Sequence, residues 1–438
     1  MNLKERLRGS KYQGYAYTYP HKSAYRRFAP LDLDHVWREE ERGALFLYIH
    51  VPFCEMRCGF CNLFTYANPK ERMVDQYLRT LAVQAATVRD ALGGSARFAR
   101  LAVGGGTPTF LEVADLERLF RIIASFDIPL DRVPISFEMS PGTLTRDKVA
   151  VLEDHGVDRV SIGIQSFIER ETKTLGRPQP PAEARRALAL LREGSFPTLN
   201  IDLIYGIHGQ TEASWLASLE AALAFAPEEL YLYPLYVRPR TGIAGRHELI
   251  VSDHAFGLYR LAVQFPAEAG YRRASMRLFR RHDQDHAPGP VYCCQEDGMV
   301  GLGPGARSYT RTLHYCTEYA VTRPGVKAIL SDYLRREAAD FARVDYGFKL
   351  GREERLRRYV IKSVGHAGGL DLGACRAWSD MEAMAALPLL GEATELGLLE
   401  RVGDRLVPTS SGFDHGDVLA PALYSEAVRQ LMEAYEFA

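Results

Sequence analysis

The sequence lacks an apolar run of about 18 residues, which is the length that a membrane-spanning helix requires. Its first residues, Met-Asn-Leu-Lys-Glu-Arg, do not form a secretory signal. A charge excess of either sign is also missing, because 54 Lys and Arg stand against 55 Asp and Glu, and this balance argues against nucleic acid or an anionic membrane as a partner. We therefore expect a soluble, cytoplasmic monomer that binds neither nucleic acid nor membrane.

Cysteine is scarce and odd in number, with seven among 438 residues. Disulfides are not expected in a reducing compartment. The neighbours Cys293 and Cys294 are predicted to be buried thiols, with a redox or substrate role as the alternative.

Three other cysteines, Cys54, Cys58 and Cys61, follow an apolar run over residues 45–51 that predicts a buried strand. Iron-sulfur clusters and structural zinc sites normally have four protein ligands. Three cysteines on one loop can hold three irons of a 4Fe-4S cluster and leave the fourth iron open. On spacing alone, a zinc ion completed by a residue such as His50, or three small buried thiols, are the alternatives.

Short apolar runs alternate with amphipathic stretches between residues 44 and 240. This alternation is typical of a parallel sheet covered by helices. Six such units fit a partial (β/α)6 barrel, and an open doubly wound sheet is the alternative. The predicted strands cover residues 44–51, 98–103, 133–139, 159–164, 198–204 and 229–234, and the predicted helices cover 73–92, 112–126, 145–155, 181–193 and 212–225.

Residues with chemical function follow the predicted strands at their carboxyl ends, where ligand sites of parallel α/β proteins gather. We expect them to share one mouth of the barrel. A run of glycines lets the backbone approach a ligand and exposes its amides. In chain order these features are the cysteine loop, Gly104-Gly-Gly-Thr-Pro-Thr, Glu138, Gln165 and Asp202.

The chain divides into four predicted regions: a Tyr-rich N-terminal arm (1–43), the core (44–240), a core extension that shapes the substrate site (241–345) and a C-terminal, mainly helical domain (346–438). The last region resembles a winged helix but has no basic stripe, so we expect a cap rather than a DNA-binding domain. The rings of the arm are expected to seal the underside of the core. The alternative is that arm residues close the active site or bind acidic groups: Tyr15, Tyr17, Tyr19, Lys22, Arg26 or Arg27.

The stretch from Tyr48 to Asn62, with its three cysteines and Phe60, resembles the signature of radical S-adenosylmethionine (SAM) enzymes, and more narrowly their oxygen-independent coproporphyrinogen III oxidase-like branch. The Gly-Gly-Gly-Thr-Pro turn resembles another element of that family. The resemblance implies a 4Fe-4S cluster on the three cysteines, one or two SAM molecules, an electron donor such as flavodoxin or ferredoxin, and a small-molecule or peptide substrate. It implies catalytic roles for Tyr48, Glu138 and Gln165, and SAM contacts for Tyr48, Phe60, Gly105, Gly106, Thr107, Glu138, Gln165, Arg177, Asp202, Tyr236 and Arg307.

The sequence departs from the oxidase pattern at Leu63, where the resemblance implies an additional cysteine, and at Ile207-His208-Gly209, where it implies Leu-Pro-Gly. His208 is either a proton donor or a solvated loop residue. The departures lead us to expect SAM cleavage to a 5'-deoxyadenosyl radical followed by one-carbon transfer with a second SAM. The first alternative is coproporphyrinogen III oxidation, and the second is a haem chaperone. For the oxidation, candidate carboxylate-binding residues are Arg26, Arg27, Arg238, Arg240 and Arg280.

Overall fold

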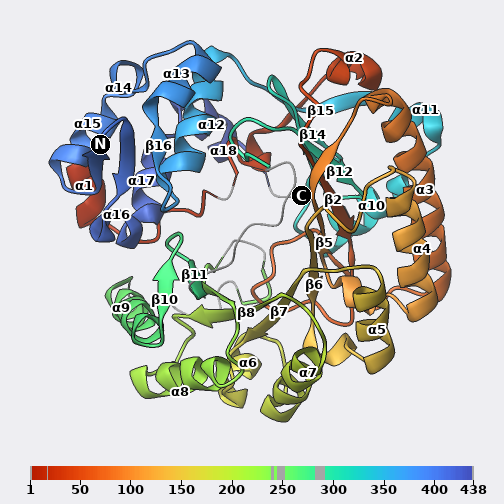
Figure 1. Cartoon of the computed structure of the whole chain (residues 1–438), viewed down its shortest axis with the longest axis horizontal. Helices are drawn as coiled ribbons and strands as arrows, with labels where there is room; N and C mark the ends of the chain where they lie inside the picture. The colour runs from red at the N-terminus through yellow and green to blue at the C-terminus, as the bar shows by residue number, and fades with distance from the viewer. Residues whose placement is uncertain (1, 17, 238–240, 244–251, 282–291, 437–438) are drawn as a thin grey trace.

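A 13-stranded mixed sheet forms the centre of the computed structural model, which describes all residues except 1, 17, 238–240, 244–251, 282–291 and 437–438 (Figure 1). Six parallel strands in chain order make up its middle. All six strand predictions are confirmed, with bounds that differ by at most two residues. The strands are β2 (Leu45–Val51), β5 (Phe98–Gly105), β6 (Ile135–Met139), β7 (Arg159–Gln165), β8 (Thr198–Tyr205) and β9 (Glu229–Pro234).

The helices between these strands lie on the outside of the curved sheet (Figure 1). Since βαβ crossovers are right-handed and the strand order never reverses, successive helices fall on the same face. A doubly wound sheet reverses its order and carries helices on both faces, so the partial barrel is the correct alternative. The helices are α3 (Glu71–Leu92), α4 (Val113–Ala124), α5 (Arg146–Asp154), α7 (Pro181–Glu193) and α8 (Glu212–Leu223), with an unpredicted short α6 (Glu169–Thr174) before α7.

The core strands have two different faces, as β2 illustrates. Leu45, Leu47 and Ile49 are fully buried and belong to the same apolar core as the inward residues of α3. Phe46 and Tyr48, which alternate with them, are only half-buried. The concave face of the sheet is therefore open to an interior space, which we call the lumen, and it carries many of the polar residues of the core strands.

Further strands extend the sheet at both edges, so residues 241–345 continue the core sheet. β12 (Met299–Leu302) pairs in parallel with β2, and three antiparallel strands follow it towards the N-terminal arm. These elements are β13 (Arg307–Tyr309), β14 (Leu313–Cys316) and β15 (Arg343–Lys349) at one edge, β11 (Leu278–Arg281) and β10 (Tyr271–Arg273) at the other, and helices α9 (Ser252–Glu268), α10 (Arg323–Tyr333) and α11 (Ala338–Phe341).

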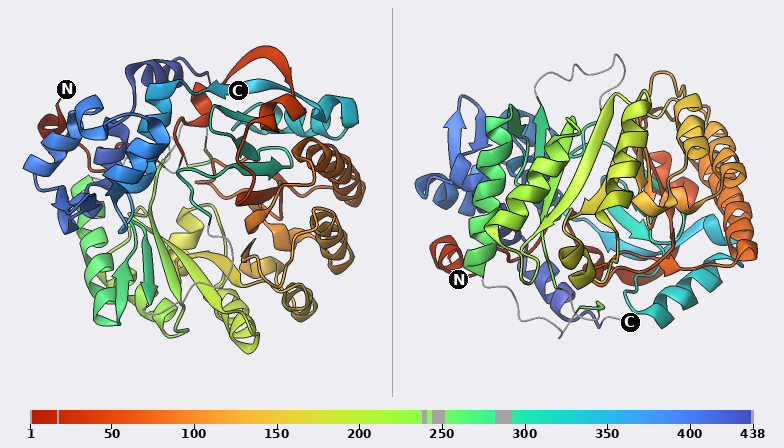
Figure 2. Two further views of the ribbon diagram at one scale, coloured as in Figure 1. Left: turned by 45° about the horizontal axis from the view of Figure 1, so that its top comes forward. Right: turned by 90° about the horizontal axis from the view of Figure 1, so that it is seen from below.

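The N-terminal arm is more regular than the sequence suggests. It forms α1 (Leu3–Arg8), an edge strand β1 (Arg26–Asp32) and α2 (Leu33–Arg38). The strand pairs with β15, more than 300 residues later in the chain, and no local apolar pattern can reveal such a pairing. Helix α1 lies against the C-terminal domain in both views of Figure 2. The arm therefore joins the two units of the protein, and Tyr17 lies outside the described residues.

The C-terminal domain has its own apolar core and a three-stranded sheet. Helices followed by a two-stranded hairpin confirm the winged-helix-like, mainly helical prediction. Residues 383–395 form two helices, because Pro388 between them cannot donate a backbone hydrogen bond within a helix. The elements are α12 (Arg352–Val364), β16 (Leu370–Asp371), α13 (Leu372–Ser379), α14 (Ala383–Ala386), α15 (Leu389–Glu395), β17 (Leu399–Val402), β18 (Arg405–Pro408), α16 (Ser410–Asp414), α17 (Gly416–Ala422) and α18 (Glu426–Glu433).

Among the described residues, no helix combines the length and the apolar character needed to cross a bilayer.

A buried ion pair connects the core to the C-terminal domain. Arg277, between β10 and β11, donates to both carboxylate oxygens of Asp417 in α17 at 2.6 Å. The two residues are 5% and 1% exposed. The guanidinium also donates to the hydroxyl of Tyr236 at 2.7 Å and lies 3.9 Å from the ring centre of Tyr15. Core, arm and C-terminal domain therefore meet at one charged residue.

Asp417→Asn should lower the free energy of unfolding by about 3–5 kcal/mol, since it leaves the guanidinium of Arg277 buried without its counter-charge. Urea titration followed by tryptophan fluorescence measures this change. Asp380→Asn, in an ion pair with Arg352 that is largely exposed, is the matched control and should leave unfolding unchanged. Equal unfolding curves for both variants would show that the buried pair does not hold the domains together.

Candidate active site

The cysteine loop is held at both ends at the carboxyl end of β2. The short strands β3 (Phe53–Cys54) and β4 (Tyr66–Ala67) pair in parallel and close the loop. The amide of Tyr66 donates to the carbonyl of Pro52 at 2.7 Å, and the amide of Asn68 donates to that of Cys54 at 2.9 Å. The three thiols therefore project from a closed loop with a fixed base.

Gly59 fixes the middle of the loop against two other segments. Its amide donates to the carbonyl of Leu175 at 2.9 Å, and its carbonyl accepts from the amide of Ile243 at 3.0 Å. A Cβ atom at Gly59 would lie 2.8 Å from both residues. Only glycine allows this close approach, so the loop is positioned by the turn after α6 and by the segment after β9.

Each thiol has a polar neighbour from the surrounding structure. The hydroxyl of Thr107 donates to Sγ of Cys54 at 3.5 Å, and Nη1 of Arg177 lies 4.0 Å from Sγ of Cys58. The hydroxyl of Thr65 lies 3.9 Å from Sγ of Cys61. Donors near sulfur stabilise thiolate ligands, which is the form that iron binds.

The donor set fits an iron-sulfur cluster and does not fit the zinc alternative. His50, proposed as a fourth zinc ligand, is buried, and its Nε2 donates to the carbonyl of Phe64 at 2.8 Å while Nδ1 lies 3.3 Å from the hydroxyl of Tyr48. Within the described part of the chain, no three His, Cys, Asp or Glu side chains are close enough to share one metal ion.

Burial raises the pKa of Cys54 to about 12 and also raises the pKa of Cys58. Burial therefore favours the protonated form of these two thiols, and a bound metal would supply the positive charge that favours the thiolate.

The glycine turn packs against the cysteine segment, and this corrects one prediction. The amide of Gly105 donates to Oε2 of Glu138 at 3.1 Å, and the amides of Gly106 and Thr107 donate to the carbonyls of Val51 and Phe53 at 2.7 Å. These amides are not exposed to a ligand as predicted. A Cβ on Gly105 or Gly106 would lie 2.6 Å from His50 or 2.5 Å from Phe53, so the glycines allow two strand ends to touch.

The two acidic residues predicted for the site, Glu138 and Asp202, both lie on the concave face of the sheet. They project into the lumen from β6 and β8, and enclosure by the barrel raises the pKa of Glu138. Burial raises the pKa of Asp202 to about 7, while the amide of Asn200, which donates at 2.7 Å, and the charge of Arg159 oppose the rise. These carboxylates can each accept hydrogen bonds from an amine or hydroxyl group of a ligand.

Two further predicted residues lie at the same mouth. Arg177 donates through Nη2 to the carbonyl of Gly163 at 2.8 Å and to the hydroxyl of Ser140 at 3.0 Å. Gln165 has a φ of +69° at a register shift of β7. A positive φ in a non-glycine residue is strained and is typical of functional sites.

Other predictions have a different outcome. The hydroxyl of Tyr236 donates to Asp417 and accepts from Arg277 between the domains, and its predicted contact with SAM stays a prediction. Phe60 packs with Leu175 and Ile207 beneath the loop. Three of the carboxylate-binding candidates have other partners: Arg26 binds backbone carbonyls, Arg27 pairs with Glu318 and Asp345, and Arg280 pairs with Glu229, while Arg238 and Arg240 lie outside the described residues. Arg307, predicted to contact SAM, lies 5.8 Å from the ring of Tyr309.

The sequence interpretation missed several lumen residues. Arg159 donates to Glu229 at 2.7 Å and to Ser136 at 3.0 Å. Tyr231, on β9, shares a 2.9 Å hydrogen bond with Tyr15 of the arm, which places one arm residue at the lumen. The alternation of side chains along the strands could have identified them, since these residues lie on the same face of the sheet as Glu138.

The family model of the radical SAM superfamily matches residues 48–222. An oxygen-independent coproporphyrinogen III oxidase of Bradyrhizobium diazoefficiens is 32% identical over 380 residues, which cover 82% of each chain. The chain belongs to the radical SAM superfamily. Within it, the chain falls in the oxygen-independent coproporphyrinogen III oxidase-like branch.

Two further relatives support this membership. The heme chaperone HemW of Escherichia coli is 30% identical over 272 residues, which cover 60% of this chain and 69% of that protein. The solved structure of coproporphyrinogen III oxidase (HemN) from Escherichia coli has a TM-score of 0.75 at 24% identity and covers 89% of this chain and 92% of that chain. The shared fold is therefore nearly complete, and membership of the superfamily implies a 4Fe-4S cluster and SAM.

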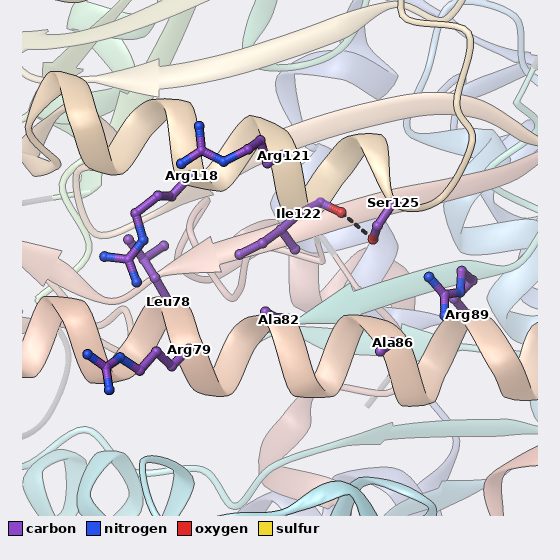
Figure 3. Close-up of a pocket in the computed structure, with 9 residues that line it drawn as sticks. All are labelled: Leu78, Arg79, Ala82, Ala86, Arg89, Arg118, Arg121, Ile122 and Ser125. Atoms are coloured by element: carbon purple, nitrogen blue, oxygen red, sulfur yellow. Dashed lines mark hydrogen bonds between the residues drawn. The ribbon is translucent and has the colours of Figure 1, made fainter.

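A separate hollow lies between α3 and α4 on the outside of the barrel (Figure 3). Its lining includes four arginines and none of the residues discussed above: Leu78, Arg79, Ala82, Ala86, Arg89, Arg118, Arg121, Ile122 and Ser125.

Anaerobic reconstitution should yield about four irons per chain, as a 4Fe-4S cluster requires. Cys54→Ala, Cys58→Ala and Cys61→Ala should each lose most of this iron, because each removes one of three ligands. Iron and sulfide analysis measures the content. Cys375→Ala, in the core of the C-terminal domain, is the control and should keep it. Unchanged iron in any loop variant would exclude that cysteine as a ligand.

Asp202→Asn should stabilise the protein, and more so at pH 8 than at pH 5. The folded pKa of about 7 lies above the ordinary value of 3.8, so the folded state holds a proton that the unfolded state loses. Stability of the wild type therefore falls as the pH rises from about 4 to about 7. Melting temperatures across this range test the prediction, and parallel curves for the two proteins would contradict it.

Proposed function

We propose that this radical SAM protein removes a hydrogen atom from a carboxylate-bearing small molecule held in the lumen, with oxidative decarboxylation as the first candidate reaction. The observation that carries the proposal is a polar lumen that opens directly beneath a three-cysteine loop. The name of the relative that shares 32% identity, an oxygen-independent coproporphyrinogen III oxidase, points in the same direction.

A reduced 4Fe-4S cluster with bound SAM supplies the carbon radical that takes a hydrogen atom from a substrate. The residues of this chain hold and orient the reactants. Cys54, Cys58 and Cys61 would bind three irons, and the loop that carries them has no fourth cysteine. Glu138 and Asp202 would bind the polar groups of SAM or substrate. Tyr48, with its hydroxyl near His50, would border the same space.

In the decarboxylation a propionate side chain becomes a vinyl group. The substrate gives up one hydrogen atom, carbon dioxide and one electron, so the reaction needs an electron acceptor as well as the donor that reduces the cluster. We propose a small redox protein such as flavodoxin or ferredoxin as that donor.

The second candidate is one-carbon transfer with a second SAM molecule. This is the reaction that we expected from the sequence. Leu63 supports it, because this residue stands two places after Cys61, where the oxidase pattern has a further cysteine, and its side chain is 46% exposed. The relatives described above are oxidases and a chaperone, so decarboxylation takes precedence.

Reconstituted protein should form 5'-deoxyadenosine from SAM under dithionite, and Cys58→Ala should form none. With coproporphyrinogen III and an electron acceptor, mass spectrometry should show loss of carboxyl groups. S-adenosylhomocysteine alongside 5'-deoxyadenosine would instead favour methyl transfer. A stable haemin spectrum without SAM cleavage would indicate a chaperone, and an intact cluster that never cleaves SAM would contradict the enzymatic proposal.

A further inference from the structure

The end of the lumen farthest from the cysteine loop contains a group of arginines. Arg100 lies on β5 beside Phe46 of β2 in the sheet register, and it occupies the strand face that bears Gly104. Four residues separate Arg100 from Gly104, and at about 3.3 Å per residue this is about 13 Å along the strand. A group bound at Arg100 would therefore lie well below the SAM-binding mouth.

Among the residues that the structure describes, the arginines at this end outnumber the acidic side chains beside them. Arg159 and Arg280 both donate to the carboxylate of Glu229 at 2.7 Å, so one acidic residue serves two guanidinium groups. Arg100 lies near both arginines and near Glu229. Across the described residues, no side chain forms an ion pair or hydrogen bond with Arg100.

A ligand in the lumen can contact Arg100, and the position of this cation is electrostatically unfavourable. Its side chain is solvent-accessible, but the barrel surrounds it, and this enclosure together with the neighbouring Arg159 lowers its pKa. An enclosed cation without a counter-charge is unfavourable. A bound anion would remove that cost.

Aromatic rings form the wall next to this cation. The guanidinium of Arg100 lies 5.7 Å from the ring centre of Phe46, and the ring of Tyr292 lies 5.2 Å from that of Phe46. A single guanidinium matches the single charge and the planar, two-oxygen geometry of a carboxylate. The rings suit an apolar group attached to that carboxylate.

We propose that the inner end of the lumen is a carboxylate-binding site in which Arg100 receives an acidic group of the substrate, with Phe46 and Tyr292 packing on the carbon atoms next to it. This proposal rests on the proposed function in one respect, which is that the lumen holds the substrate. It adds the residue that anchors the substrate and the end of the lumen at which the anchor lies.

The test uses the purified full chain without SAM or reductant, so its result is independent of the assay for 5'-deoxyadenosine. The probe is 3-phenylpropionate, and 3-phenylpropionamide is its uncharged counterpart. Thermal-shift titration should show that the acid stabilises the wild type and the amide does not. Arg100→Gln should weaken binding of the acid by about tenfold or more, as expected for loss of a charged hydrogen bond, and Arg100→Lys should retain part of it.

Arg121→Gln, an arginine on the outer face of α4 (Figure 3), is the matched control and should bind as the wild type does. Arg100→Gln should melt no lower than the wild type, because it removes an enclosed charge that has no ion-pair partner in the described part of the chain, and this separates lost binding from lost folding. The proposal is overturned if the acid stabilises the wild type no more than the amide does, or if Arg100→Gln binds the acid unchanged.

Discussion

The packing of apolar strand residues against the outer helices determines which side chains reach the lumen. Leu45, Leu47 and Ile49 of β2 are fully buried against the helical layer. Because side chains alternate along a strand, Tyr48 and His50 must then face inwards. The same alternation directs Glu138, Asp202 and Arg100 into the interior from three other strands. The apolar contacts that stabilise the barrel therefore also fix the orientation of its functional residues.

The cysteine loop depends on close backbone contacts at its base. Gly59 touches the turn after α6, Gly106 touches the segment that begins the loop, and Thr107 lies against Cys54. These contacts connect the ends of several core strands. A cluster would keep an open coordination position only if no further protein ligand could move onto that iron. A loop that is fixed by several backbone contacts meets this requirement.

Local patterns in the sequence predict the core well. The six parallel strands have strong apolar periodicity, and Cys54, Cys58 and Cys61 are adjacent in sequence, so strands and metal ligands could both be predicted. Non-local contacts could not. The pairing of β1 with β15 spans most of the chain, and the engagement of Tyr236 by Arg277 and Asp417 requires knowledge of the domain interface. The amides of the glycine turn were predicted to face a ligand, but their partners are carbonyls of a neighbouring strand. Arg100 was missed because a single charged residue in an apolar strand gives no sign that the one acidic residue near it, Glu229, is already paired with two other arginines.

The central claim is that Cys54, Cys58 and Cys61 would hold a 4Fe-4S cluster at the mouth of the polar lumen and leave one iron without a protein ligand. Electron paramagnetic resonance of the reduced, reconstituted protein with and without SAM tests this claim most directly. The account predicts a 4Fe-4S signal that SAM changes, since SAM binds the open iron, and that keeps responding to SAM in Arg100→Gln, because that residue lies at the far end of the lumen. A spectrum that SAM leaves unchanged would contradict the account.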